Sequence, residues 1–243
     1  MNQLLKLAEL FSQYKLYPIQ CFDNTSIAHI FQTTHPKDSY AKDLTKILEI
    51  QHYKPEQRGA DLPWWGKRFF SKSIKPRVMI ISQDSNSPNA GSIVFHACLW
   101  PYMDYNEYKK YIRNNRLVLY RGFGLSRDLI QVIGFDNIYI TDARKVYKKV
   151  PIKDKDFDED YSKELLEWEI SICDPELIVL LGEKTMHFMD FEERYNEVCG
   201  NQVLTRNNRP YIVAPFPSGA NLSYNTRAEI TKMFIRQILD RMT

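Results

Sequence analysis

The sequence lacks the usual marks of a zinc-binding, secreted or membrane protein. Its four cysteines, Cys21, Cys98, Cys173 and Cys199, lie far apart, and no two form a CxxC pair. This spacing argues against a zinc ribbon or an iron–sulfur cluster and is typical of buried, reduced thiols. No basic segment followed by a long apolar stretch opens the chain, and no run approaches the roughly 20 apolar residues that span a bilayer. We therefore expect no metal, no cofactor, no signal peptide, no membrane segment and a cytoplasmic location.

Repeats, low-complexity segments and linkers rich in Gly, Ser or Pro are also absent. The 243 residues, 44% hydrophobic and 26% charged, are enough for one sizeable core and typical of a globular protein. The net charge of +3 is compatible with a nucleic-acid partner but does not indicate one. We predict a single domain over residues 1–243, in which a helical or irregular extension, residues 1–70, packs on a core formed by residues 76–243.

Four short apolar runs predict the strands of this core. They rely on Val, Ile and Leu without polar alternation, as strands buried on both faces of a parallel sheet do, and span residues 78–81, 138–140, 177–181 and 211–213. Apolar residues at helical spacing predict helices over residues 161–172 and 226–241. Strands that alternate with helices indicate an α/β fold, and we expect a three-layer α/β/α sandwich with a four-stranded parallel central sheet.

The first third of the chain gives weaker signals. Residues 43–50 are a helix candidate, and residues 63–70, PWWGKRFF, are aromatic and basic. We interpret PWWGKRFF as a hydrophobic flap that closes onto the sheet, with a nucleic-acid-facing role for Lys67 and Arg68 as the alternative.

Small or polar residues follow each predicted strand. These segments are Ser82-Gln83-Asp84, the run from Thr141 to Lys145, Gly182-Glu183-Lys184, and the run APFPSGAN at 214–221. In open α/β sheets, functional residues cluster just beyond the carboxyl ends of the strands. A structural role, such as Asp142 capping a helix, is the alternative for any one of them. Together they predict a site at this edge.

In this order and placement the segments resemble the motifs of the uracil-DNA glycosylase superfamily. SQDSNS at 82–87, with Phe95 closing the loop, is similar to a strand followed by Gly-Gln-Asp-Pro-Tyr-His and then a Phe. The strand ending at Asp142 resembles one that ends in a base-reading Asn, and FPSGAN at 216–221 resembles His-Pro-Ser with a tip residue. Residues 174–188, DPELIVLLGEKTMHF, are similar to the family's third strand and following helix. The resemblance covers residue 76 to the C-terminus.

The resemblance implies a DNA glycosylase, which draws a nucleotide out of the stack and hydrolyses its N-glycosidic bond. Asp84 would stabilise the positive charge that develops on the deoxyribose and orient the attacking water, and Gln83 would help shape the pocket. Phe95 would stack on the extracted base, with ordinary core packing as its alternative role. Asp142 and Phe216 would complete the base pocket.

The resemblance also implies contacts with DNA. Small residues would let the backbone approach the nucleic acid closely, and basic ones would contact phosphate. The residues concerned are Ser85, Asn86, Ser218, Gly219, Ala220, Asn221, Arg144 and Lys145. Ala220 stands near the place of a Leu wedge, and Leu222 or Tyr224 would have to substitute for it.

Two residues depart from the family pattern. Asp142 replaces an Asn, and an ionised carboxylate offers only acceptors, so it fits an exocyclic amine better than the O4 of uracil unless it is protonated. Phe216 replaces a His that donates to the base, and a phenyl ring cannot donate. These departures predict a divergent member of the family.

Three functions remain open on the sequence alone. The first is a metal-independent glycosylase that releases uracil or a related deaminated base from DNA. The second is a protein of the same fold that binds DNA or a protein partner without catalysis, for which Asp142 and Phe216 argue. The third is a hydrolase of free nucleosides on a similar three-layer fold.

Overall fold

The computed structural model describes residues 3, 6, 7, 10, 63–66, 68–71, 76–83, 93–97, 99–114, 119–144, 159–217 and 224–242, without the side chains of Val94, Phe95 and Tyr224. The helix predicted over residues 43–50, and Lys67, lie outside this part of the chain. At the N-terminus, Leu7 and Leu10 belong to the hydrophobic core.

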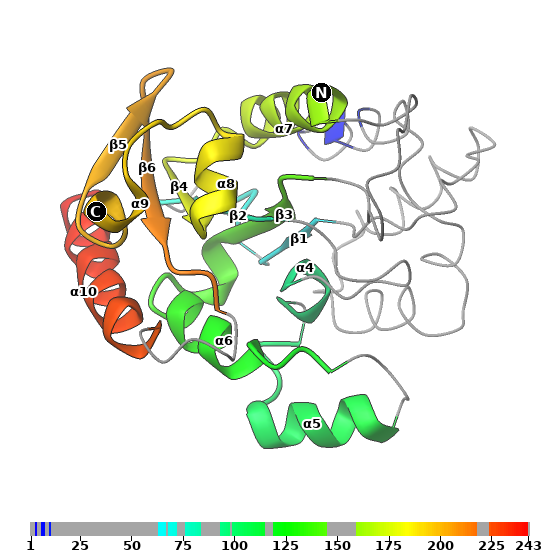
Figure 1. Ribbon diagram of the computed structural model, residues 1–243. Helices are drawn as coiled ribbons and strands as arrows, with labels where there is room; N and C mark the ends of the chain where they lie inside the picture. The colour runs from blue at the N-terminus through cyan, green and yellow to red at the C-terminus, as the bar shows by residue number, and fades with distance from the viewer. Residues whose placement is uncertain are drawn as a thin grey trace.

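The described residues form one six-stranded sheet in the order β1-β3-β2-β4-β6-β5 (Figure 1). Its strands are β1 (Trp64–Trp65), β2 (Val78–Ser82), β3 (Ile138–Asp142), β4 (Leu177–Leu181), β5 (Val203–Arg206) and β6 (Arg209–Ala214). The four predicted runs are β2, β3, β4 and β6, which pair in parallel. These runs are apolar without alternation because a central parallel strand is covered on both faces.

The expected four-stranded sheet was wrong in its strand number, because an antiparallel strand lies at each edge. β5 pairs with β6 through a two-residue turn, where Asn207 and Asn208 have φ values of 51° and 59°. Asparagine tolerates positive φ, and this tight turn suits a β-hairpin.

The other edge strand corrects our interpretation of residues 63–70. Trp64 and Trp65 are not a flap over the sheet but the strand β1, which pairs with Ile140 and Tyr139 of β3. Trp65 stacks on the ring of Tyr139 with 5.9 Å between centroids. Large aromatic side chains favour a strand here because they pack against their cross-strand neighbours.

Helices connect the strands and follow the last one. They are α4 (Ile93–Ala97), α5 (Tyr105–Asn114), α6 (Phe123–Gln131), the short 3-10 helix η2 (Phe135–Asn137), α7 (Glu159–Cys173), α8 (Glu183–Phe188), α9 (Tyr195–Val198) and α10 (Tyr224–Met242). The predicted helices over residues 161–172 and 226–241 are α7 and α10. Within the described residues, none of these helices has the length and apolarity needed to cross a membrane.

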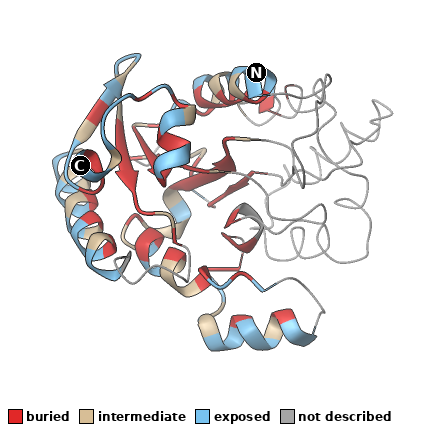
Figure 2. Ribbon diagram, viewed as in Figure 1, coloured by how far each residue is buried: buried red, intermediate tan, exposed pale blue. Residues whose placement is uncertain are grey.

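Helices lie on both faces of the sheet. All five residues of β2 and all five of β4 are buried, although neighbouring side chains of a strand point to opposite faces. Figure 2 shows these central strands as the buried centre of the molecule. The β2–β3 and β3–β4 connections run in opposite directions across the sheet, so right-handed crossovers place α4–α6 on one face and α7 on the other.

Candidate functional site

The carboxyl ends of β2 and β3 stay joined beyond the strands. Ser82 lies opposite Asp142 in the parallel register. The amide of Ala143 donates to the carbonyl of Ser82 at 2.8 Å, and the amide of Arg144 donates to that of Gln83 at 2.9 Å. Asp142 is the last residue of β3 rather than a loop residue, and only 3% of it is exposed. Gln83 and Asp142, which belong to two different motifs, are thereby brought to one edge.

The ends of β4 and β6 join the same edge through Gly182. Its amide donates to the carbonyl of Ala214 at 2.8 Å, and its φ of +87° lies in the region that favours glycine. A Cβ at this position would lie 2.9 Å from the Cβ of Phe216. The half-buried Phe216 ring therefore packs against a residue that has no side chain.

The segment after Phe216 is fixed from the other side by the start of α6. The hydroxyl of Tyr120 donates to the carbonyl oxygen of Pro217 at 3.0 Å. A Cβ on Gly122 would lie 1.8 Å from the same oxygen, a separation that real atoms cannot adopt. Only glycine lets the chain leading to residue 218 approach α6 this closely.

A buried polar chain continues from Tyr120 to α4. The amide of Tyr120 donates to the hydroxyl of Tyr108 at 2.8 Å, and that hydroxyl lies 3.0 Å from Nδ1 of His96. The imidazole of His96 also stacks on the ring of Tyr120, with 5.2 Å between centroids. Burial lowers the pKa of His96 to about 3, so the ring is neutral at physiological pH. Because Tyr108 accepts from Tyr120, its own proton is available to Nδ1 of His96.

The structure describes only some of the residues that the sequence predicts for the site. Gln83, Asp142, Arg144 and Phe216 lie at the edge formed by the carboxyl ends of the strands. The backbone of Phe95 lies in α4, one residue before His96, and its side chain is outside the described residues. The remaining predicted residues also lie outside them: Asp84, Ser85, Asn86, Lys145, Ser218, Gly219, Ala220 and Asn221.

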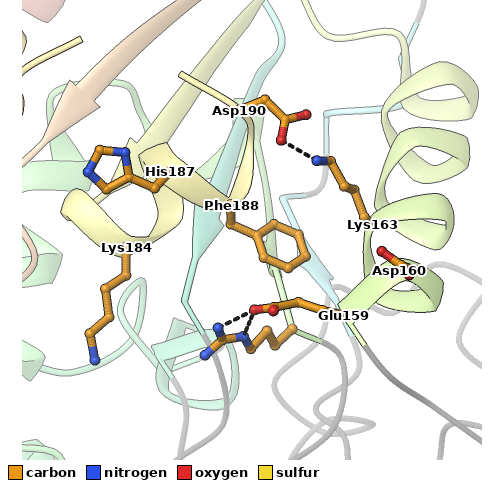
Figure 3. A pocket seen from close by; sticks show the side chains of 8 residues that line it. Glu159, Asp160, Lys163, Lys184, His187, Phe188 and Asp190 are labelled. Atoms are coloured by element: carbon orange, nitrogen blue, oxygen red, sulfur yellow. Dashed lines mark hydrogen bonds and ion pairs between the residues drawn. The ribbon is translucent and has the colours of Figure 1, made fainter. Parts of the chain in front are cut away.

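A separate pocket of about 410 Å³ opens between the start of α7 and α8 (Figure 3). Of the predicted site residues that the structure describes, only Arg144 lines it, and its Nε donates to Glu159 at 2.8 Å. A second ion pair joins Lys163 to Asp190 across the pocket. These charges neutralise one another, so the pocket has no strong preference for an anionic ligand. Among the described residues, no cluster of three or more His, Cys, Asp or Glu side chains is arranged to hold a metal ion.

The comparisons with known proteins confirm the resemblance seen in the motifs. The family model described as the uracil DNA glycosylase superfamily matches residues 69–242. The chain belongs to this superfamily. A search of proteins with curated function finds no match. The match begins just before β2 and includes every strand of the parallel sheet, so the superfamily membership rests on the whole core rather than on one motif.

Sequence reasoning missed the residues that hold the site together. Gly122 stands in the run RGFG, and a glycine is a local sign of a turn or a close approach. His96, Tyr108 and Tyr120 have no such sign, because their contacts join segments that are 12 or more residues apart.

Proposed function

We propose that this member of the superfamily is a DNA glycosylase of base excision repair that hydrolyses the N-glycosidic bond of uracil or a related deaminated base. The observation that carries the proposal is the meeting of three motif segments at one edge of the sheet. Backbone hydrogen bonds join the segment of Gln83 to the segment of Asp142 at this edge. Phe216 packs on Gly182 at the end of the neighbouring strand. Superfamily membership supports the same class of reaction.

In the proposed reaction the bond between C1′ of the deoxyribose and the base nitrogen breaks, and the base leaves with the bonding electrons. Positive charge develops on the sugar, and the carboxylate of Asp84 stabilises it electrostatically. Asp84 also orients the water whose oxygen adds to C1′, and the proton of that water is released to solvent or to the departing base. Asp84 follows Gln83 directly, and Gln83 is held by its carbonyl, which accepts from Arg144.

Base recognition is assigned to Phe95, Asp142 and Phe216. Phe95 supplies a stacking face, which contributes about 1–3 kcal/mol per base in nucleic-acid binders. Asp142 supplies acceptors for the edge of the base from a position that is almost fully buried. Phe216 supplies an apolar wall and no hydrogen-bond donor, so a backbone amide has to stabilise the negative charge on the base.

Contacts with the DNA backbone are assigned to the loops after β2, β3 and β6. They use Ser85, Asn86, Ser218, Gly219, Ala220, Asn221, Lys145 and Arg144. Pro217, held by Tyr120, sets the point from which the last of these loops starts. Arg144 shares its guanidinium with Glu159, so its contribution to phosphate binding is smaller than that of an unpaired arginine.

A cleavage assay tests the proposal. Single- and double-stranded oligonucleotides that contain uracil, hypoxanthine or xanthine are incubated with the protein, and abasic product is measured. We expect release of at least one of these bases, and a loss of about 100-fold or more for Asp84→Asn, because the carboxylate stabilises charge that exists only in the transition state. Folded wild-type protein that yields no abasic product from any substrate would overturn the proposal.

A second function, DNA binding without catalysis, is favoured by one observation. Phe216 occupies the position of a donor side chain and packs on Gly182 instead. This function predicts that DNA affinity is unchanged by Asp84→Asn and that the wild-type protein shows no turnover.

A further inference from the structure

We propose that the outward face of α5 is a binding surface for the phosphate backbone of duplex DNA. The proposal rests on the proposed function and extends it to a helix that contains none of the motif residues. In Figure 1, α5 lies beside α6 and outside the sheet.

The exposed side of α5 is basic. Tyr108 and Ile112 turn toward the core, whereas Lys109, Lys110 and Arg113 are exposed. Residues three and four positions apart are neighbours on a helix, so the side chains of Arg113 and the two lysines form one cluster. Arg121, also exposed, follows near the start of α6.

The acidic residues at the start of α5 hydrogen-bond to backbone amides and form no ion pair with this cluster among the described residues. The carboxylate of Glu107 accepts a hydrogen bond from the amide of Asp104 at 2.8 Å. Asp104 in turn accepts from the amides of Asn106 and Glu107, at 2.7 and 2.9 Å. This reciprocal pattern is a capping box, which uses both carboxylates to stabilise the helix end. Across the ranges that the structure describes, no ion pair joins Lys109, Lys110 or Arg113 to an acid.

The same helix is rigidly attached to the candidate site. The ring of Tyr108 stacks on Phe123 of α6 with 3.7 Å between centroids and 1° between planes. Its hydroxyl accepts from the amide of Tyr120, whose own hydroxyl donates to the carbonyl of Pro217. Two hydrogen bonds thus connect α5 to the segment that leads into the proposed DNA-contacting loop. A phosphate bound by α5 would therefore have a fixed position relative to that loop.

The distribution of charge favours α5 and α6 over the segment of α7, α8 and α9 as a place for DNA. Residues 101–131, which contain α5 and α6, have six basic and three acidic residues. Residues 159–198, which contain α7, α8 and α9, have twelve acidic and three basic residues. A DNA duplex carries one negative charge per about 1.7 Å of its axis, so it is attracted to the first segment and repelled by the second.

The test is the salt dependence of binding to undamaged duplex DNA. Each phosphate contact contributes about 0.9 to the slope of log affinity against log salt concentration. We expect the triple variant Lys109→Gln, Lys110→Gln, Arg113→Gln to lower the magnitude of this slope by about 2 to 3. At 0.1 M salt we expect its affinity to fall by about ten-fold or more. Fluorescence anisotropy of a labelled duplex measures both, and the thermal unfolding curve checks that α5 stays folded.

A matched control separates the surface from the net charge. The variant Arg194→Gln, Arg236→Gln, Arg241→Gln also loses three exposed positive charges, one just before α9 and two in the later turns of α10. We expect its slope to remain within about 0.5 of the wild-type value, since none of these residues lies on α5. An equal fall in slope for both variants would show that net charge, not α5, governs binding and would overturn the proposal.

Two other outcomes are decisive. A weaker affinity for single-stranded oligonucleotides with unchanged duplex binding would also overturn the proposal, since the predicted partner is the duplex. The base-release assay fails or succeeds independently, because it depends on Asp84 and uses damaged DNA. If no base is released but the α5 variant shows the expected slope, the glycosylase function fails and the binding surface stands.

Discussion

At the scale of single residues, Asp142 is the residue that we propose controls base preference. It differs from an asparagine only in having an oxygen where the amide has NH2, and its backbone is held by β2 on one side. With only 3% of the residue exposed, water cannot easily replace a missing hydrogen-bond partner. The hydrogen-bonding pattern of this one side chain is therefore expected to control base preference.

We predict that Asp142→Asn shifts base preference toward uracil. The amide provides a donor for O4 and an acceptor for N3–H, and a matched pair of hydrogen bonds is worth about ten-fold or more in discrimination. The measurement is the ratio of kcat/KM for uracil to that for each other base in the panel. Asp128→Asn, at an exposed carboxylate of α6, is the control for the chemical change. An unchanged ratio would contradict the role of Asp142.

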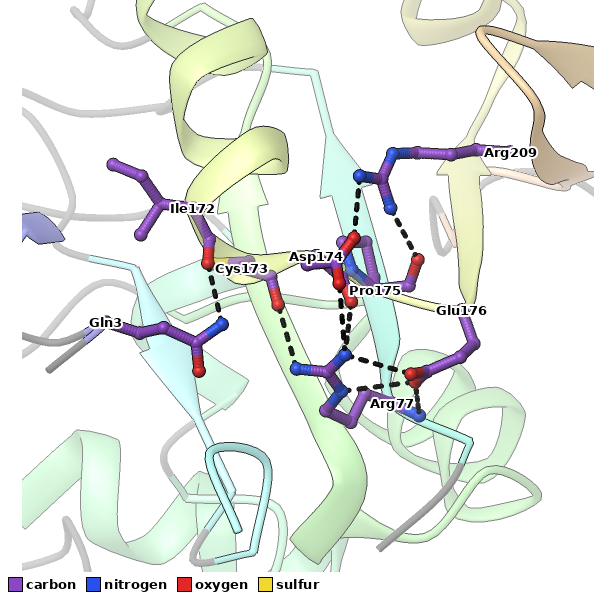
Figure 4. A network of polar contacts seen from close by, with 8 residues as sticks. All are labelled: Gln3, Arg77, Ile172, Cys173, Asp174, Pro175, Glu176 and Arg209. Carbon is purple, nitrogen blue, oxygen red and sulfur yellow. Dashed lines mark hydrogen bonds and ion pairs between the residues drawn. The ribbon is translucent and has the colours of Figure 1, made fainter. Parts of the chain in front are cut away.

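At the scale of elements, a network of polar contacts joins the amino ends of the strands (Figure 4). Arg77, just before β2, donates to the carboxylate of Glu176 at 2.9 Å and to the carbonyl of Cys173 at 3.2 Å. Arg209, at the start of β6, donates to Asp174 at 2.7 Å. These contacts lie at the opposite edge of the sheet from the candidate site, because the parallel strands begin here and end there.

We predict that Arg77→Met lowers the free energy of unfolding by about 2–4 kcal/mol, because the half-buried carboxylate of Glu176 and the carbonyls of Cys173 and Asp174 lose the guanidinium that donates to them. Denaturant unfolding measures this loss. Arg194→Met, at an arginine whose side chain is 85% exposed, should change it by less than about 0.5 kcal/mol. Base release per folded molecule should stay at the wild-type rate. A loss of stability no larger than that of the control would contradict the structural role of Arg77.

The strands that sequence patterns predicted are those with a continuous buried run along the chain. β2 and β4 are buried at every residue, so their apolar runs are visible without knowledge of the fold. β1 has only two residues, and β5 mixes buried, half-buried and exposed ones. Neither strand therefore produces an apolar run that could be recognised in the sequence. α5 was missed because only Tyr108 and Ile112 of its ten residues are buried.

The candidate site was predictable to a similar degree. The rule for carboxyl ends of parallel strands placed Gln83 and Asp142 together, since it depends only on strand direction. It says nothing about Tyr120 and Pro217, whose hydrogen bond spans 97 residues of sequence. Such contacts follow from the packing of α6 on the sheet, which no local pattern encodes.

At the scale of the whole molecule, His96 couples folding to pH. It is 1% exposed, and it lies between Tyr108 and Tyr120. An imidazolium loses its hydration when it is buried, so the folded state holds this ring neutral, with a pKa of about 3 against 6.5 in the unfolded chain. Between these values the unfolded chain binds one proton more than the folded chain at this residue.

We predict that this difference weakens the fold as the pH falls. Above about pH 6.5 the ring is neutral in both states, and its pKa shift has no effect on stability. Below pH 6.5, and down to about pH 3, the free energy of unfolding should fall by about 1.4 kcal/mol per pH unit through His96 alone. Denaturant unfolding of the wild type and His96→Gln between pH 7 and 4.5 measures the slope. The variant should start less stable at pH 7 and show a smaller slope by about that amount, since glutamine does not titrate.

His187→Gln, at an exposed histidine of α8, controls for the loss of an imidazole and should retain the wild-type slope. Parallel curves for wild type and His96→Gln would mean that His96 is protonated equally in both states, contrary to its burial.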